Sequence, residues 1–270
     1  IEKSFREFIL SDYDRIIIGS TDSHPLSVDK ILPNISKRIA AGDNVALLVF
    51  DGMGIDQWEI IKQYLTSRSL VVKTESSVYA MLPTLTKYSR WSIFSGMAPN
   101  EFVTSKRGAQ EKSLFTDFWK LNDLNSEDVI FLHLVPDLTR LQKQDESMSR
   151  FMSGVREETR VIGVVFSFID KMLHGPYDLD VGKKFLYQGI EKFLESSCLA
   201  EIFTILQKHG YKTYVTSDHG NLVATGNGVR DSKYLVETRG KRCLVYDRKV
   251  LAEEKQKRGD VTLFSSRFIP

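Results

Sequence analysis

The chain has 270 residues, of which 42% are hydrophobic and 27% charged, and its formal net charge is +2. This composition is that of an ordinary globular protein and excludes a wholly disordered chain. Because positive and negative charges are almost equal in number, the chain has no overall electrostatic field that would attract it to nucleic acid or anionic lipid. A local basic patch remains compatible with this charge.

The apolar runs are short, such as 45–50 and 161–166, whereas a transmembrane helix needs about 20 apolar residues. We therefore expect no membrane span. The two cysteines, Cys198 and Cys243, cannot form a disulfide framework, and we interpret them as reduced thiols of a cytoplasmic protein. The first residues contain neither an initiator methionine nor an apolar signal core, so we expect residues 1–270 to be a single domain of a longer protein with further domains.

Short apolar runs alternate with longer helical segments along the chain. Several runs are unbroken, as expected for strands buried on both faces. Alternation of strand and helix predicts an α/β fold with a mostly parallel central sheet and helices on both faces. The expected strands are 15–19, 45–50, 70–82, 129–135, 161–169, 213–216 and 243–246.

The segments between these runs carry helical patterns. Residues 55–65 place apolar side chains on one face, and residues 180–206 form a long amphipathic stretch that stops at His209-Gly210, a usual helix end. A further helix is expected to end at Gly96. The irregular, charged residues 97–160 predict either a cap inserted beside the active edge or a helical connection between two strands.

Three of the expected strands are followed by an aspartate, and two of these bring a histidine. The residues are Asp51, then Asp170 with His174, then Asp218 with His219. In open α/β sheets, sites form at the carboxyl ends of the strands, and aspartate and neutral histidine are ligands that zinc and manganese accept. An aspartate at one strand end is more often a cap or turn residue. The coincidence of three at one sheet edge favours a metal site.

The remaining histidines and a threonine turn have structural alternatives. We interpret His24 and His209 as structural and His133, inside an apolar run, as a satisfied core residue. Thr84 and Thr86 lie where a helix begins, and threonine is a common N-cap. The functional alternative is a hydroxyl bound to a metal that acts as a nucleophile, with the N–H groups of the helix start holding a phosphate oxygen.

Four motifs together resemble the PglZ domain of the alkaline phosphatase superfamily. That superfamily also contains nucleotide pyrophosphatase/phosphodiesterases and cofactor-independent phosphoglycerate mutases. The resemblance spans about residues 44–221 in the superfamily's order and implies an alkaline-phosphatase-like fold. The motifs are Asp51-Gly-Met, Pro83-Thr-Leu-Thr-x-x-Ser-Arg with Phe94-Ser-Gly, Asp170-x-x-x-His174-Gly and Thr216-Ser-Asp-His-Gly.

The resemblance implies a nucleophile and a first metal. In the phosphodiesterase branch the nucleophilic threonine stands ten residues before the glycine that closes its helix, which selects Thr86 over Thr84. One metal would be held by Asp51, Asp218 and His219, with Thr86 facing it.

The resemblance also implies a second metal, held by Asp170, His174 and a further histidine. No histidine follows His219, so this ligand lies in a segment beyond the given sequence or the second site is weakened. Ser89 occupies the place of an asparagine that helps to hold a phosphate oxygen. Arg90 supplies a positive charge to the substrate or, as an equal alternative, is structural.

The activity implied is hydrolysis of a phosphate ester by a threonine nucleophile and two divalent metals, zinc or manganese. A phosphodiesterase or nuclease acting on nucleotide-type substrates, nucleic acid included, is favoured. The alternatives are a phosphomonoesterase or phosphomutase, or a catalytically weakened binding or signalling module. The basic residues Arg239, Lys241 and Arg242 would contact a phosphate backbone or form a solvated face.

Overall fold

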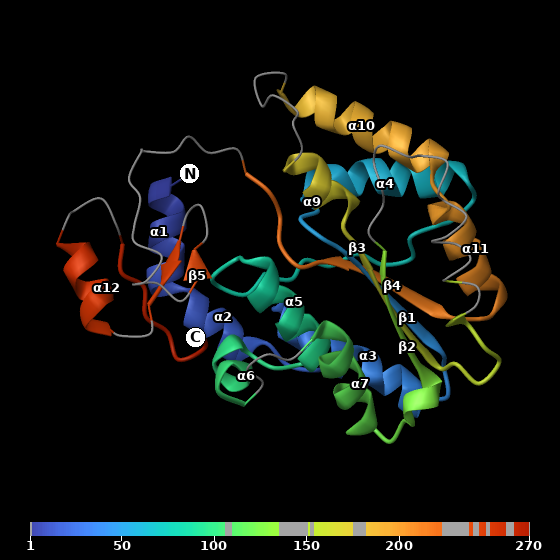
Figure 1. Ribbon diagram of the computed structural model, residues 1–270, viewed down its shortest axis with the longest axis horizontal. Coiled ribbons are helices and arrows are strands. Elements are labelled where there is room, and N and C mark those ends of the chain that lie inside the picture. Colours follow the sequence, from blue (N-terminus) through green and yellow to red (C-terminus); the bar gives the residue numbers. More distant parts are fainter. Residues whose placement is uncertain are drawn as a thin grey trace.

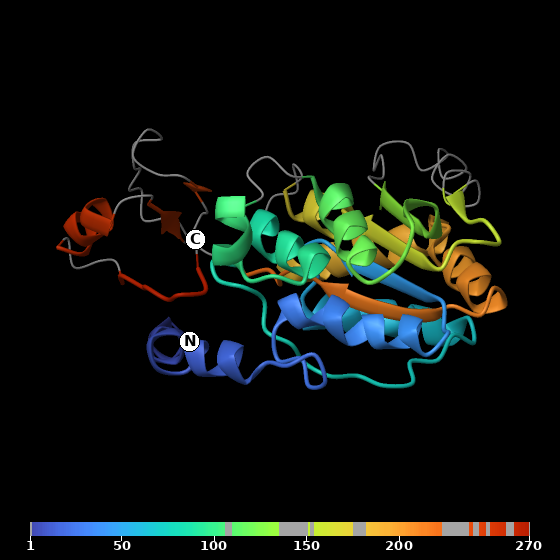
Figure 2. The same cartoon turned by 90° about the horizontal axis from the view of Figure 1, so that it is seen from below.

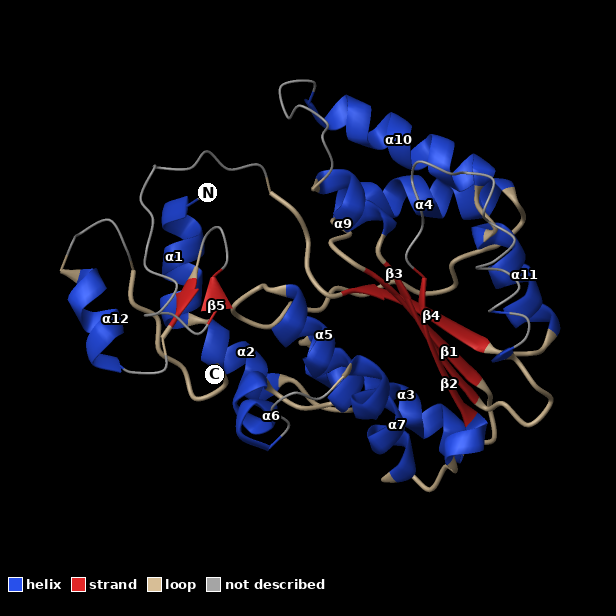
Figure 3. Cartoon of the chain, in the orientation of Figure 1, coloured by secondary structure: helices blue, strands red, loops and turns tan. Residues whose placement is uncertain are grey.

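The computed structural model describes residues 2–105, 110–134, 151, 154–174, 182–222, 238–239, 243–246, 249–257 and 262–269. A parallel four-stranded sheet in the order β2-β3-β1-β4 forms its centre (Figures 1 and 3), and a separate antiparallel pair joins β5 to β6. The strands are β1 (Val45–Phe50), β2 (Val129–Leu134), β3 (Val161–Phe166), β4 (Lys212–Ser217), β5 (Thr238–Arg239) and β6 (Leu244–Val245).

Helices flank the sheet, and α-helices also lie in the N-terminal and C-terminal parts of the described chain. The described 3-10 helices are η1 (Val28–Lys30) and η2 (Ser126–Asp128). The α-helices are α1 (Glu2–Ser11), α2 (Tyr13–Gly19), α3 (Ile31–Ala40), α4 (Ile55–Ser67), α5 (Thr86–Ser95), α6 (Pro99–Ser105), α7 (Glu111–Lys120), α9 (Phe168–Leu173), α10 (Gly182–Ser196), α11 (Leu199–Lys208) and α12 (Lys249–Gln256).

Both faces of the sheet are covered, which confirms the predicted fold class. Along β1, Val45, Leu47 and Val49 pack with α2, α3, α5 and α7 on one face. The residues between them, Ala46 and Leu48, pack with α4, α9, α10 and α11 on the other (Figure 1). Successive strand side chains point to opposite faces, so an unbroken apolar run is what a strand between two helical layers requires.

Two of the expected strands are wrong. Residues 15–19 belong to helix α2, in which Tyr13 and Ile17, four residues apart, are buried while Ile18 is exposed. Residues 70–82 form an extended coil. Among the described residues, a single β-bridge, between Tyr79 and Ser27, pairs this coil with another segment. Local apolar content suggested strands there, but a strand also needs a partner edge along its length.

Three other segments differ in their boundaries. The run 161–169 ends as a strand at Phe166, and α9 starts at Phe168 with residues that are just as buried. The long helix expected over 180–206 is divided into α10 and α11 by the turn at Ser197. Residues 243–246 contribute β6 to the separate two-stranded sheet. In 161–169, the continuous apolar run therefore predicted correctly that the residues are buried, but it did not show where the strand ends and the helix begins.

Several local predictions are confirmed. Helix α4 covers the expected 55–65, and α5 ends at Gly96, whose φ of 69° lies in the left-handed region that glycine adopts without strain. Within 97–160, β2 is an edge strand of the central sheet and α7 buries Leu114, Phe115 and Trp119 against it. Residues 106–109, 135–150 and 152–153 of this range lie outside the described part.

The first and the last described helices lie at the same end of the molecule. Figures 1 and 2 show α1 and α12 at this end, away from the central sheet. The ring of Phe264 meets that of Tyr13 edge to face, with ring centroids 5.5 Å apart. Among the described helices, none combines the length and the apolar character needed to cross a bilayer.

Candidate functional site

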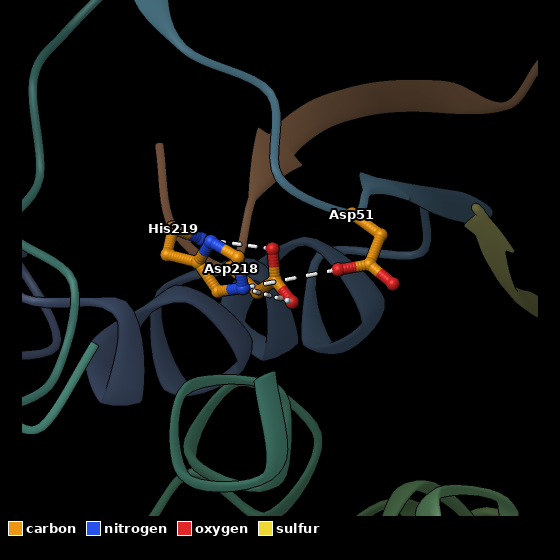
Figure 4. Close-up of side chains that lie close together, drawn as sticks. All are labelled: Asp51, Asp218 and His219. Carbon is orange, nitrogen blue, oxygen red and sulfur yellow. Dashed lines mark hydrogen bonds and ion pairs between the residues drawn. The ribbon is translucent and has the colours of Figure 1, made fainter. Parts of the chain in front are cut away.

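The carboxyl ends of β1 and β4 bring together three side chains that the sequence places far apart. The two strands are neighbours and parallel, and Phe50 pairs with Ser217. The next residues, Asp51 after β1 and Asp218 with His219 after β4, therefore meet at one sheet edge (Figure 4). One ligand atom from each lies within 4.8 Å of the others. We call Asp51, Asp218 and His219 the sheet-edge cluster.

Backbone groups hold the cluster in place. Asp218 Oδ1 accepts hydrogen bonds from the backbone N–H of Gly52 at 3.0 Å and of His219 at 2.8 Å. Gly52 has a φ of 72°, a conformation that a side chain would strain. The Ser217 hydroxyl donates to the carbonyl of Phe50 at 2.9 Å. These contacts tie the turn after β1 to the turn after β4.

Two amide side chains that the sequence analysis did not single out strengthen this connection. Asn221 Nδ2 donates to the carbonyl of Gly52 at 2.9 Å and to Gln57 Oε1 at 2.7 Å. The same Gln57 oxygen accepts the N–H of Gly54 at 2.7 Å, and Gln57 is fully buried. Asn221 follows the Thr216-Ser-Asp-His-Gly motif directly, which is the sequence feature that could have identified it.

Two carboxylate oxygens of the cluster are buried without a hydrogen-bond partner. They are Asp51 Oδ1 and Asp218 Oδ2. Burial raises the pKa of Asp218 to about 7, with neighbouring Asp51 adding to the rise and His219 opposing it. A buried carboxylate oxygen that has no hydrogen-bond partner is costly unless a cation compensates it. The donor set therefore fits a divalent metal, whose charge and vacant coordination positions would satisfy both oxygens.

The orientation of His219 also suits a metal ligand. Its Nδ1 lies 2.9 Å from the carbonyl oxygen of Gly220, and a carbonyl can only accept. The hydrogen bond thus assigns the proton to Nδ1 and leaves the lone pair on Nε2. This arrangement, in which the second ring nitrogen is held by the backbone, is the usual one for histidines that bind metals.

Thr86 lies against the cluster at the start of α5. Its Oγ1 is 2.9 Å from His219 Nε2. Leu85, rather than a threonine, occupies the N-cap position, and Thr86 is the first helical residue. The Thr86 hydroxyl is therefore directed to the cluster and is not the cap of the helix, which supports the choice of Thr86 over Thr84.

Arg90 lies one turn further along α5, on the same face as Thr86. Its Nη1 is 2.8 Å from Asp51 Oδ2, and its Nε is 2.7 Å from Glu111 Oε1 and 3.9 Å from Asp218 Oδ2. The guanidinium is thus an inward-facing cation among three carboxylates. Glu111 was missed by the sequence analysis, because nothing in its local pattern distinguishes it from any acidic residue that opens a helix.

Ser89 has a different environment. It is fully buried, and its hydroxyl donates to the carbonyl of Met81 at 3.4 Å. The structure therefore does not bring this predicted substrate-binding residue into the cluster. On a helix, neighbouring residues point about 100° apart, so Ser89 and Arg90 face different surroundings.

Asp170 and His174, which we call the α9 pair, lie beside the cluster. Their Oδ1 and Nε2 atoms are 3.3 Å apart, and their side chains are 29% and 58% exposed. A side chain at Gly52 would come within 3.7 Å of Asp170 Cβ, so α9 packs against the turn after β1. Burial first, and then the charge of Asp51, raise the pKa of Asp170. The pair belongs to the same sheet edge but is less enclosed.

His133 is not the core residue that the sequence suggested. It is exposed because β2 is an edge strand, although its Nε2 does find a partner in the Ser167 hydroxyl at 2.7 Å. Of the predicted basic cluster, Arg239 belongs to β5, and Lys241 and Arg242 lie outside the described residues.

Comparison with known proteins agrees with the resemblance found in the sequence. A family model described as the BREX system PglZ alkaline phosphatase-like domain matches residues 33–267. The match includes every residue of the sheet-edge cluster and the α9 pair. A search of curated proteins finds no match.

Proposed function

We propose, since this chain belongs to the PglZ family of alkaline phosphatase-like domains, that it is a metal-dependent phosphohydrolase. We propose phosphodiesters of the nucleotide type as its substrates, with nucleic acid as one such substrate, and a cytoplasmic setting in which Cys198 and Cys243 stay reduced. The observation that carries the proposal is the contact between Thr86 Oγ1 and His219 Nε2 at 2.9 Å, beside two buried carboxylate oxygens that lack partners.

Charge supports the use of divalent metals. Asp51, Asp218 and Glu111 contribute three carboxylates, while Arg90 is the cation that contacts them. With all four groups ionised the balance is −2, which one divalent cation would neutralise. We propose that Asp51, Asp218 and His219 hold the first metal and that the α9 pair contributes to a second, with zinc or manganese as the metal.

When bound, two such ions would stabilise the charge on the attacking and leaving oxygens of a phosphoryl transfer. The nucleophile that forms the covalent intermediate comes from the chain itself. Thr86 Oγ1 forms a bond to phosphorus as the ester bond to the leaving group breaks and the hydroxyl proton passes to solvent. Water then breaks the bond between Thr86 Oγ1 and phosphorus, which releases the phosphomonoester product and restores the hydroxyl.

Two groups of α5 would orient the phosphoryl group. The first backbone N–H groups of the helix have no partners within it and can donate to a phosphate oxygen. Arg90 projects from the same face one turn later and adds a positive charge. Because α5 carries the nucleophile as well, one rigid element sets the distance between Thr86 and these groups.

The test is hydrolysis of bis-p-nitrophenyl phosphate by the metal-stripped chain after Mn²⁺ or Zn²⁺ is added. We expect activity that depends on the added metal and falls by about 10³-fold or more in Thr86→Ala, since a nucleophile is lost. Thr84→Ala is the matched control, because it removes the same hydroxyl two residues away, and it should keep most of the activity. Full activity in Thr86→Ala would refute the nucleophile assignment.

Metal titration by calorimetry separates the enzyme from the alternative of a binding module. We expect the unsubstituted chain to bind Mn²⁺ or Zn²⁺ saturably and the Asp218→Asn variant to lose this binding. Binding that is absent in the intact chain would favour a domain that keeps the fold without the chemistry.

A further inference from the structure

Glu111 is the part of the site for which neither the motifs nor the family match provides a role. It is the first residue of α7, its side chain is 15% exposed, and its Oε1 lies 2.7 Å from Arg90 Nε. Helix α7 packs against α5, so the contact joins two helices on the same side of the sheet. The placement is therefore set by tertiary packing and is shared with the helix that carries Thr86.

Burying this carboxylate is costly. Burial raises the pKa of Glu111, Arg90 opposes the rise, and Asp51 adds to it. Two features offset the cost. The positive end of the α7 dipole favours an acidic side chain in the first turn, and the ion pair with Arg90 supplies the opposite charge. A glutamate at this position changes the charge of the site as well as its packing.

The contact with Glu111 limits what Arg90 can offer a substrate. Nη1 of Arg90 donates to Asp51 Oδ2 at 2.8 Å, and Nε forms an ion pair with Glu111 Oε1 at 2.7 Å, although Nε has no partner with hydrogen-bond geometry among the described residues. The guanidinium is thus held in one orientation on the face of Thr86. At the same time, the Glu111 carboxylate offsets its positive charge.

We propose that Glu111 is a positioning and specificity-determining residue that fixes Arg90 and makes the site favour monoanionic phosphodiesters over dianionic phosphomonoesters. A carboxylate a few ångströms from the bound phosphate repels both substrates, but it repels a second negative charge on the phosphate in addition to the first. This inference rests on the proposed function, because it assumes that Arg90 faces the substrate phosphate, and it names the substrate class of that same site.

Ligand binding tests the inference without turnover. Calorimetry at about pH 8.5 and saturating Mn²⁺ would measure the Kd of phenylphosphonate, a dianion, and of its methyl monoester, a monoanion. Both are measured in a Thr86→Ala background with and without Glu111→Gln. We expect Glu111→Gln to improve the affinity for the dianion by about tenfold relative to the monoanion, because one nearby negative charge is removed.

Two further variants make the result decisive. Glu191→Gln makes the same chemical change at an exposed position of α10 and should leave both affinities unchanged. Glu111→Asp keeps the charge, so the ratio of the two affinities should stay within about twofold of the parent, and this variant remains informative if Glu111→Gln folds poorly.

Equal changes for both ligands in Glu111→Gln would mean that Glu111 is merely structural, and would overturn the inference. A ratio in Glu111→Asp that shifts as it does in Glu111→Gln would overturn it too, since charge would then not be the cause. Turnover of bis-p-nitrophenyl phosphate by the unsubstituted chain is a separate measurement. Its absence would refute the proposed function, while the ratio of binding constants decides the role of Glu111.

Discussion

The sheet-edge cluster and the α9 pair lie at the same edge of one sheet, yet they are held very differently. Asp51 and Asp218 are 5% and 0% exposed, and backbone N–H groups and amide side chains fix the two turns that carry the cluster. Asp170 lies in the short helix α9 and His174 follows that helix directly; their side chains are 29% and 58% exposed, and they contact each other. Under the proposed function, this difference means that the cluster would be preorganised for a metal, whereas the pair would be completed by a second metal or by the substrate.

The largest expected difference between the sheet-edge cluster and the α9 pair is in the rate of hydrolysis. Asp218→Asn removes a buried ligand and should lower hydrolysis of bis-p-nitrophenyl phosphate by about 10³-fold or more, while Asp170→Asn should lower it by about 10- to 100-fold. Both substitutions are isosteric, so circular dichroism should show an unchanged fold. Equal losses in the two variants would show that the two groups act as a single unit.

Thermal stability provides the next contrast. A ligand that binds the folded chain at about 100 times its Kd stabilises it by about 2.7 kcal/mol, which corresponds to a rise in Tm of roughly 5–10 °C for a chain of this size. We expect Mn²⁺ to produce this rise in the unsubstituted chain and in Asp170→Asn. Asp218→Asn should show little or none, and a full rise there would place the tight site elsewhere.

The hydrogen bonds of Asn221 should control the affinity of the cluster for metal. Asn221→Ala removes both amide contacts, to Gly52 and to Gln57, and should weaken Mn²⁺ binding by about tenfold, as outer contacts of metal ligands commonly do. Asn122→Ala is the matched control, because that amide also donates to a backbone carbonyl, of Phe118 at 2.8 Å, away from the site. Comparable weakening in Asn122→Ala would point to a general loss of stability.

The smallest effect concerns the opposite end of the sheet, where Tyr211 precedes β4. Its hydroxyl donates to the carbonyl of Thr159 at 2.6 Å, and burial raises its pKa to about 12. An acid whose pKa rises on folding stabilises the fold while it is protonated. The contribution of Tyr211 is complete below its ordinary pKa of about 10 and is lost as the pH rises through about 12.

Urea unfolding of Tyr211→Phe checks this expectation. The variant should be about 1 kcal/mol less stable near pH 8, because it lacks one hydrogen bond, and the gap should close between about pH 10 and pH 12. Mn²⁺ affinity should not change. If the difference in unfolding free energy between the two proteins stays constant with pH, the pKa of the Tyr211 phenol is the same in the folded and the unfolded chain, and the expectation is wrong.

Much of the site could be predicted from the sequence because its parts are short and local. Asp51, Asp170 and Asp218 each follow an apolar run closely, and parallel strands bring their carboxyl ends to one edge. The start and end of α5 could be recognised from the threonine turn and Gly96. Missing from that prediction were Glu111 and Gln57, since each reaches the site from a helix whose position depends on packing.

The sequence by itself determined the α/β class, the strands β1 and β4 and the motif residues at their ends, because unbroken apolar runs and turn residues act over a few neighbours. Only the tertiary structure decided that 15–19 is helical and that 70–82 is coil, since a strand exists only where another edge accepts its hydrogen bonds. The tertiary structure also decided that the sheet-edge cluster is buried while the α9 pair is more exposed to solvent. Burial and charge compensation depend on which helices cover each ligand, and no short stretch of sequence contains that information.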